Sequence, residues 1–210
     1  MSRGKTLTTA AAAVAALLAL TSCSNANHQA GSTTAAGSSA ASSSATNPQA
    51  HNAQDVTFAQ QMIPHHQQAI EMSDIVLGKQ GIDPRVMDLA TRIKDAQGPE
   101  IQEMQSWLSQ WGQPTIASMP GMPAHSDMPG MPGMPGMMPE RDMEALRDAQ
   151  GAAASRLFLT QMVQHHQGAI AMAQNEIKLG QYSPAIAMAH SIVDSQQQEI
   201  NTMQAIVSSL

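Results

Sequence analysis

The chain carries "FAQQMIPHHQQAIEM" at residues 58–72 and, one hundred positions later, "FLTQMVQHHQGAIAM" at residues 158–172. Each stretch sets two adjacent histidines among methionines. On a helical wheel of about 100° per residue, Met62, His65 and His66 fall within an arc of about 120°, the width of a core-facing stripe. The second stretch repeats this arrangement. The pattern predicts two helices whose buried faces carry the histidines.

A second helical segment follows each stretch after a short break and a proline, so a two-helix unit occurs twice. These second segments share a pattern of Gln, Glu, Ile and Met. It is formed by Gln97, Glu100, Ile101 and Met104 in the first copy and by Gln196, Glu199, Ile200 and Met203 in the second. Asp83 and Ser183 are predicted N-caps, because proline follows each at the first helical position. Pro64 and Pro99 lie inside the first copy's helices, and we expect them to kink those helices without ending them.

Two helices joined by a short turn are antiparallel, and two such hairpins joined by a long crossover resemble a ferritin-like four-helix bundle. The predicted fold class is therefore all-α, with a duplicated four-helix domain over residues 55–210. The expected first hairpin is 55–111, the Met/Pro/Gly-rich crossover 112–140 and the second hairpin 141–210. A pseudo-twofold axis between the halves would place their histidine-bearing helices together.

The N-terminal region is predicted to be processed and not to join the folded domain. Residues 1–22 combine Arg3 and Lys5 with a short apolar run, as secretory signal peptides do. The run ends at Cys23 in a sequence that resembles the lipobox of bacterial lipoproteins, so we expect Cys23 to be lipidated. Residues 23–54 are rich in Ser, Ala and Thr and are predicted to form a disordered linker, with a root-mean-square end-to-end distance of roughly 30 Å.

The composition excludes several classes of protein. Cys23 is the only cysteine, so the mature domain has no internal disulfide and no thiolate for metal. Without Arg3 and Lys5, 8 of the 10 basic residues remain against 16 acidic ones, a net charge of −8 that disfavours nucleic acid as a partner. The sequence holds 17 methionines but only two phenylalanines, two tryptophans and one tyrosine.

Polar residues share the inward stripe of each second helix. On the wheel, Gln97 and Glu100 lie beside Met104, and Gln196 and Glu199 lie beside Met203 in the second copy. A buried carboxylate is costly unless it is paired. Facing an imidazole, it would orient the ring and fix its tautomer, as the groups behind metal ligands do.

Two matched His-His pairs with methionines at the same spacing favour a metal site over chance. Any one of these methionines, taken alone, is more often core filler. Thioethers select Cu(I), whereas zinc sites prefer thiolate, imidazole and carboxylate. A di-iron bundle needs Glu-x-x-His motifs, and none occurs here. The residues therefore predict copper, more readily Cu(I) than Cu(II).

The crossover contains repeated Met-Pro-Gly that cannot form a regular helix. Its candidate metal-capturing residues are Met119, Met122, His125, Met128, Met131, Met134, Met137 and Met138. The spacing resembles methionine-rich segments of extracytoplasmic copper-handling proteins. A Pro/Gly linker with apolar filler, or an adaptable protein-binding surface, stays open as an alternative.

The motif Met-x-x-His-His-x-x-Ala-Ile-x-Met, followed by Gln-x-x-Glu-Ile-x-x-Met, is similar to that of a bacterial secreted family, domain of unknown function 305. The resemblance covers about residues 55–210. It implies a ferritin-like helical bundle, an extracytoplasmic location, and copper binding in some members. The ligands that it implies are Met62, His65, His66 and Met72, with Met162, His165, His166 and Met172 in the second copy. The inward stripes add Met104 and Met203 as candidates.

The sequence thus predicts a lipoprotein on the outer face of the cytoplasmic membrane, or of another cell-envelope membrane, that sequesters or buffers copper. We expect no catalysis, because the chain lacks a thiol nucleophile, a Gly-x-Ser-x-Gly motif and a phosphate loop. A cuprous oxidase-like oxidoreductase and a non-metal interaction module stay open. So do a homodimer and a partner protein for copper exchange.

Overall fold

The structure is a computed structural model that describes residues 50–115 and 134–210, and over those residues it contains helices and no strand. The five helices are α1 (Ala53–Leu77), α2 (Pro84–Gln110), α3 (Glu140–Asp148), α4 (Gly151–Leu179) and α5 (Ser183–Ser208). Helices α1 and α2 form one hairpin, and α4 and α5 form the other. This arrangement confirms the predicted duplicated bundle.

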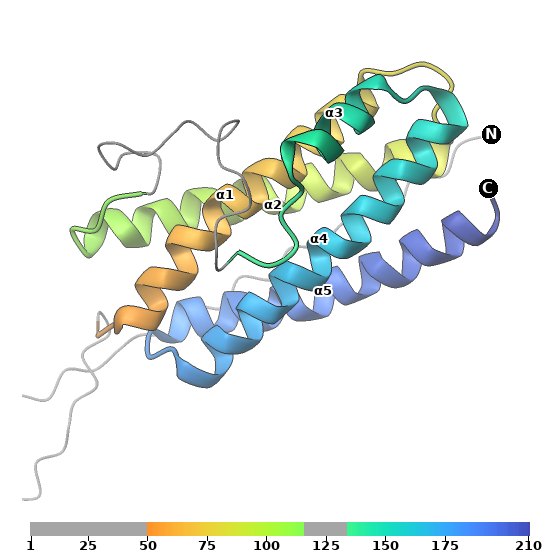
Figure 1. The fold of residues 1–210 in the computed structure, drawn as a ribbon. Helices are drawn as coiled ribbons and strands as arrows, with labels where there is room; N and C mark the ends of the chain where they lie inside the picture. Colours follow the sequence, from red (N-terminus) through yellow and green to blue (C-terminus); the bar gives the residue numbers. More distant parts are fainter. Residues whose placement is uncertain (1–49, 116–133) are drawn as a thin grey trace, which may run out of the picture. The chain divides into compact units, whose positions relative to one another are not determined.

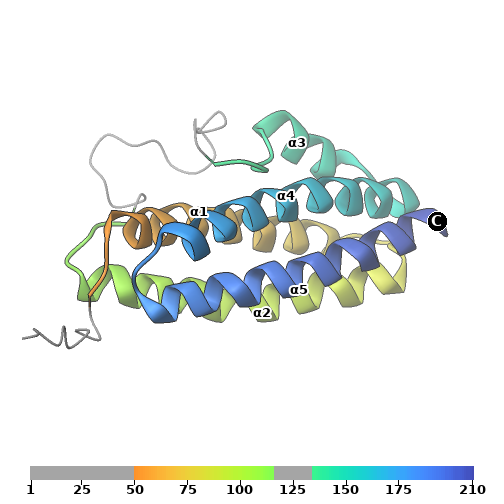
Figure 2. The same ribbon diagram turned by 90° about the horizontal axis from the view of Figure 1, so that it is seen from below.

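The helices pack in two layers. Figure 2 shows α1 beside α4 in one layer and α2 beside α5 in the other, with α3 outside the first layer. The pairing of α1 with α4 brings the two histidine-bearing helices together, as the pseudo-twofold axis predicts. The core is built from matched side chains of both copies, and Phe58 and Phe158 are among its largest fully buried members.

Helix boundaries follow local signals in most places. Asn52 caps α1 by accepting hydrogen bonds from two backbone amides of the first turn, and the Asp55 carboxylate bonds back to the Asn52 amide. Asp83 caps α2 as predicted, with Pro84 at the first helical position. The prediction was wrong by one residue at Ser183, because α5 already begins there and its cap, Tyr182, makes no side-chain bond.

The two prolines inside helices do not end them. Helix α1 runs through Pro64, and α2 runs through Pro99, as expected.

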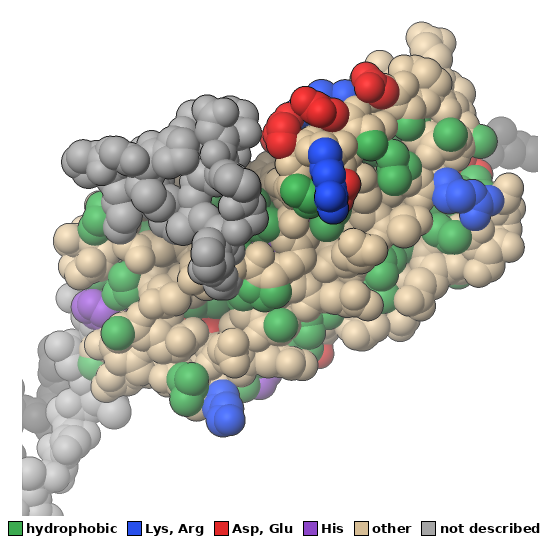
Figure 3. All heavy atoms as spheres, in the orientation of Figure 1, with side chains coloured by type: hydrophobic (Ala, Val, Ile, Leu, Met, Phe, Trp, Pro, Cys, Tyr) green, Lys and Arg blue, Asp and Glu red, His purple; other side chains and the backbone are tan. Residues whose placement is uncertain are grey.

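Helix α3 was not predicted. Residues 141–148, assigned to the second hairpin from the sequence, belong instead to this short separate helix, which packs against α1 and α4. Its buried side chains are Met143 and Leu146. Charged side chains gather over α3 on the surface shown in Figure 3, where Arg147 forms ion pairs with Glu71 and Glu140. The helix therefore has an apolar face toward the bundle and a charged face toward water.

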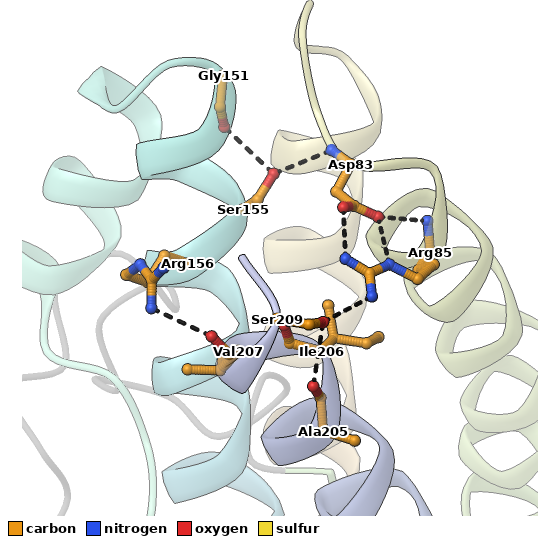
Figure 4. Close-up of polar contacts among 9 residues, drawn as sticks. All are labelled: Asp83, Arg85, Gly151, Ser155, Arg156, Ala205, Ile206, Val207 and Ser209. Atoms are coloured by element: carbon orange, nitrogen blue, oxygen red, sulfur yellow. Dashed lines mark hydrogen bonds and ion pairs between the residues drawn. The ribbon is translucent and has the colours of Figure 1, made fainter.

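Different groups tie the two ends of the α1–α4 pair. At one end the Asp55 carboxylate accepts hydrogen bonds from the amides of Gln181 and Tyr182, at 3.0 and 2.9 Å. At the other, the Ser155 hydroxyl accepts from the Asp83 amide at 3.1 Å and donates to the Gly151 carbonyl at 3.2 Å, as Figure 4 shows. Ser155 occupies the position in the second copy that Asp55 occupies in the first.

No helix among the described residues is both long and apolar enough to cross a bilayer. The predicted signal peptide, Cys23 and nearly all of the linker lie outside the described residues, as do Met119, Met122, His125, Met128 and Met131.

Candidate metal centre

The four histidines of the duplicated motif meet in the middle of the bundle. The rings of His65 on α1 and His165 on α4 are in contact, with centroids 3.8 Å apart and planes inclined by 42°. All four imidazoles are buried, as the helical wheel predicts. The two copies therefore contribute to a single shared centre.

The outer histidine of each copy is bound to a carboxylate from its hairpin partner. His66 Nε2 lies 2.7 Å from Glu100 Oε2, and His166 Nε2 lies 2.6 Å from Glu199 Oε2. An ionised carboxylate only accepts hydrogen bonds, so each Nε2 donates. The ring nitrogen that remains for a metal is therefore Nδ1. In both rings this Nδ1 is buried without a hydrogen-bond partner.

The inner histidines differ. His65 Nε2 lies 3.1 Å from the carbonyl oxygen of Pro135, at the end of the crossover, and must donate to it. Its Nδ1 has no partner, and neither nitrogen of His165 has one. A buried nitrogen without a partner costs free energy, and binding a ligand would remove that cost. The centre thus offers several unused imidazole lone pairs.

Burial keeps the inner pair uncharged. Desolvation, together with the nearby His66 and His166, lowers the pKa of His65 to about 3, although the Pro135 carbonyl opposes this. Burial and the other three histidines also lower the pKa of His165 well below its ordinary value. Only a deprotonated imidazole nitrogen can bind a metal, so the inner pair is ready to do so at neutral pH.

The candidate methionines are buried, and the fold sorts them into two apolar clusters. Met62 and Met104 of the first copy share a cluster with Met172 of the second. Met72 lies in the other cluster, with Met162 and Met203. Ten helical residues separate Met62 from Met72, about 15 Å along the axis. Each cluster therefore combines thioethers of both copies, instead of gathering Met62 and Met72 of one copy.

The remaining candidates take different positions. Gln97 and Gln196 are buried on the inward stripes, each with an unpartnered side-chain oxygen. In the described part of the crossover, Met134 and Met138 are buried and Met137 is half-buried. Met138 joins the cluster that contains Met162. Both described ends of the crossover contact the bundle, because the Pro114 carbonyl accepts a hydrogen bond from Gln60 and the Met138 backbone bonds to Gln68.

Sequence reasoning missed two groups. The Pro135 carbonyl carries no side-chain signal, so no motif marks it. Gln68, whose amide holds the backbone of Met138, could have been noticed, because the second copy has Gly168 at the matching position within an otherwise similar motif.

The available donors are soft. No three His, Cys, Asp or Glu side chains are grouped as metal ligands over residues 50–115 and 134–210. The carboxylates near the centre are already bound to His66 and His166. What remains are imidazole lone pairs between two thioether clusters, and such a donor set fits Cu(I) or a similar soft ion better than Zn²⁺ or Mg²⁺.

Known proteins are similar to this chain in sequence and in fold. Residues 55–207 match the family described as "Domain of unknown function (DUF305)". The chain belongs to the DUF305 family. No curated protein matches it. A DUF305 crystal structure from Streptomyces coelicolor, designated a secreted protein, is 31% identical over 74% of this chain and 91% of its own, with a TM-score of 0.65.

Two further structures extend the comparison. A DUF305 fragment from Deinococcus radiodurans is 32% identical, covers 76% of this chain and 98% of its own, and has a TM-score of 0.65. CopM in its Cu(I)-bound form is 32% identical, over 74% of this chain and 96% of its own, with a TM-score of 0.59. CopM has also been solved with Cu(II) and with silver. DUF305 domains thus share the helical fold seen here.

Proposed function

We propose that this protein binds copper, preferably as Cu(I), at the shared histidine centre and so buffers or sequesters it outside the cytoplasm. The observation that carries the proposal is the contact between His65 and His165, in a buried centre where five of the eight imidazole nitrogens have no hydrogen-bond partner. Thioethers flank that centre on both sides. The copper-bound and silver-bound forms of CopM support the same chemistry.

A shared centre makes a specific prediction about stoichiometry. If both copies ligate the same ion, His65→Ala/His66→Ala and His165→Ala/His166→Ala should each remove as much bound copper as the quadruple variant. Two independent sites would instead lose half of it in each double variant. Copper retained against a Cu(I)-chelating dye gives the measurement. His190→Ala, at an exposed histidine, is the matched control and should retain the parental amount.

The outcome that contradicts copper binding at this centre is a quadruple variant that retains as much Cu(I) as the parent. Retention of Cu(II) but not Cu(I) would keep the centre and correct the oxidation state. If Cu(I) neither binds nor raises the melting temperature of the parent, the interaction-module alternative is favoured.

We also propose that the protein stores the ion and catalyses no reaction with it. The centre is buried on all sides by α1, α4 and their partners, which suits retention. A cuprous oxidase would consume oxygen continuously in the presence of Cu(I) and a reductant. An oxygen electrode should record no uptake beyond that of free copper, and sustained uptake abolished in the quadruple variant would support the oxidoreductase alternative.

The proposed location is the outer face of a cell-envelope membrane, through lipidated Cys23. The secreted designation of the Streptomyces relative supports an extracytoplasmic site. In cells fed a labelled fatty acid, the parent should carry the label, and Cys23→Ser should lose it and enter the soluble envelope fraction. A labelled Cys23→Ser protein would refute the anchor.

A further inference from the structure

The end of the crossover lies across the histidine-bearing helices. We call residues Met134–Met138 the lid. The Pro135 carbonyl accepts a hydrogen bond from His65 Nε2 at 3.1 Å. The Gln68 side chain makes two hydrogen bonds to the Met138 backbone. Its Nε2 donates to the Met138 carbonyl oxygen at 2.9 Å, and its Oε1 accepts from the Met138 amide at 2.7 Å. Figure 1 shows the lid as the green segment immediately before α3.

The lid fits α4 only because two glycines face each other. A Cβ atom at Gly168 would lie 1.9 Å from the Pro135 carbonyl oxygen, which is far inside contact distance. Gly136 has a φ of +84°, and a Cβ there would lie 2.8 Å from the Gln164 carbonyl oxygen. Any larger residue at 168 would therefore push the lid away from the helix.

One position of the repeat holds the lid in the first copy and makes room for it in the second. Residue 68 in the first copy is the glutamine that holds the lid, and residue 168 in the second copy is the glycine that makes room for it. This difference breaks the twofold symmetry of the α1–α4 pair, so that the lid can dock in only one direction. As a result the lid covers the Nε2 of His65 and leaves both nitrogens of His165 unpartnered.

We propose that the lid controls access to the His65–His165 pair, and that Gln68 holds it closed. Opening the lid breaks the bond from His65 Nε2 to Pro135 and exposes that edge of the ring. If copper is the ligand, as proposed above, the ion then reaches the histidines past the lid. Gln68 is a positioning residue, since it acts on the centre only through the lid.

The test uses metal-free, full-length protein, so that it does not depend on copper binding. In Gly168→Ala the added Cβ displaces the lid, whereas in Gln68→Ala both bonds to Met138 are lost. Diethyl pyrocarbonate modifies accessible neutral imidazoles, and mass spectrometry locates the modified residue. We expect His65 modification to accelerate about tenfold or more in each variant, since two hydrogen bonds of ordinary strength hold the lid.

Matched controls separate the lid from general loosening. Gly98→Ala places the same substitution inside α2, where a Cβ meets nothing within 4 Å. Gln167→Ala truncates an exposed glutamine next to Gly168. Both should leave His65 modification at the parental rate. Amide exchange at Met138, whose N–H bonds to Gln68, should accelerate in the two lid variants only.

The outcomes are distinct. Faster Met138 exchange with an unchanged rate of His65 modification would mean that the lid moves without controlling access, which overturns the proposal. Unchanged exchange and modification in both variants would overturn the docking role of Gln68 and Gly168. Faster modification in a protein that never retains Cu(I) would support the lid and refute the proposed copper function. If Gly168→Ala fails to fold, Gln68→Ala decides.

Discussion

The two copies of the motif have the same outer histidine and different inner ones. His66 and His166 each bind a carboxylate at nearly the same distance, 2.7 and 2.6 Å. His65, in contrast, bonds to the crossover, and neither ring nitrogen of His165 makes a hydrogen bond of ordinary geometry. The outer contacts lie within each hairpin and are duplicated with it. The inner difference arises because the chain has one crossover, and one segment cannot dock symmetrically on two equivalent helices.

The two ends of the α1–α4 pair also differ between the copies, although both ends are buried. One end holds the buried carboxyl groups of Asp55 and Glu176 close together, whereas the matching residues at the other end are Ser155 and Val76. Both arrangements keep the helices paired. Away from the histidines, the two copies have therefore changed their chemistry without changing the fold.

The largest expected effect tests how equivalent the two halves are. Phe58→Ala and Phe158→Ala should each lower the free energy of unfolding by about 3–5 kcal/mol, because each removes a fully buried ring and leaves a cavity. Urea unfolding measures both. Equal losses would confirm equivalent cores. A clearly larger loss at Phe158, whose cluster includes Met138 and Met143, would show that the crossover reinforces one half.

The next effect tests the end of the α1–α4 pair that holds the carboxyl groups of Asp55 and Glu176. Burial, together with the neighbouring Asp55 carboxyl group, raises the pKa of Glu176 from its ordinary 4.5 to about 8. The folded protein therefore holds a proton between pH 4.5 and 8 that the unfolded chain releases. Its stability falls as pH rises through that window. Glu176→Val introduces the residue found at the matching position, Val76, and should remove this loss of stability. The loss is about 2–3 kcal/mol by pH 9, because one pKa unit equals roughly 1.4 kcal/mol and solvent screening reduces the total.

Melting temperatures from pH 5 to 9 give the measurement for Glu176. The isosteric variant Glu176→Gln is the control, because it removes the ionisation and keeps the size. The pKa of Asp55 is lowered by its hydrogen bonds, which outweigh the effect of burial, so its own contribution is lost only in more acidic solution. If the parent's stability does not fall above pH 5 relative to both variants, Glu176 does not carry a raised pKa.

A smaller effect tests the duplicated outer contacts. Glu100→Ala and Glu199→Ala should each cost about 1–3 kcal/mol, because each leaves a buried imidazole N–H without its acceptor. Under the copper proposal, each should also weaken Cu(I) binding about 10- to 100-fold, since the ring loses its orientation. Thermal unfolding and chelator competition measure the two effects. Glu103→Ala, at an exposed neighbour, is the control. Unequal losses would show that the outer contacts are not equivalent.

The smallest effect belongs to a contact without a strong structural role. Arg85 pairs with Asp83 and bonds to the Ser209 hydroxyl near the C-terminus (Figure 4), but it is largely exposed. Arg85→Ala should leave the melting temperature almost unchanged, because exposed ion pairs contribute little. A loss as large as that of Glu100→Ala would mean that the C-terminal end of α5 depends on this contact.

Sequence periodicity was enough to place the histidines, Met62 and Gln97 inside the bundle, and the repeat predicted that both copies do so. It also placed Glu100 where it could face an imidazole. It failed at α3 and at the cap of α5, where short or weakly marked segments depend on the surface they meet. The family resemblance implies both Met62 and Met72 as ligands, and a helical wheel does not separate them, because it records direction around a helix and ignores position along it.

By itself the sequence determined the duplicated helical hairpins, the buried histidine faces and the soft character of the donors. These are local properties, set by residue type and by spacing within a turn or two of helix. Tertiary structure alone decided that His65 meets His165, which nitrogens keep free lone pairs, and that the lid docks between Gln68 and Gly168. Those features join residues about 30 to 100 positions apart, and only the packing of α1, α4 and the lid brings them into contact.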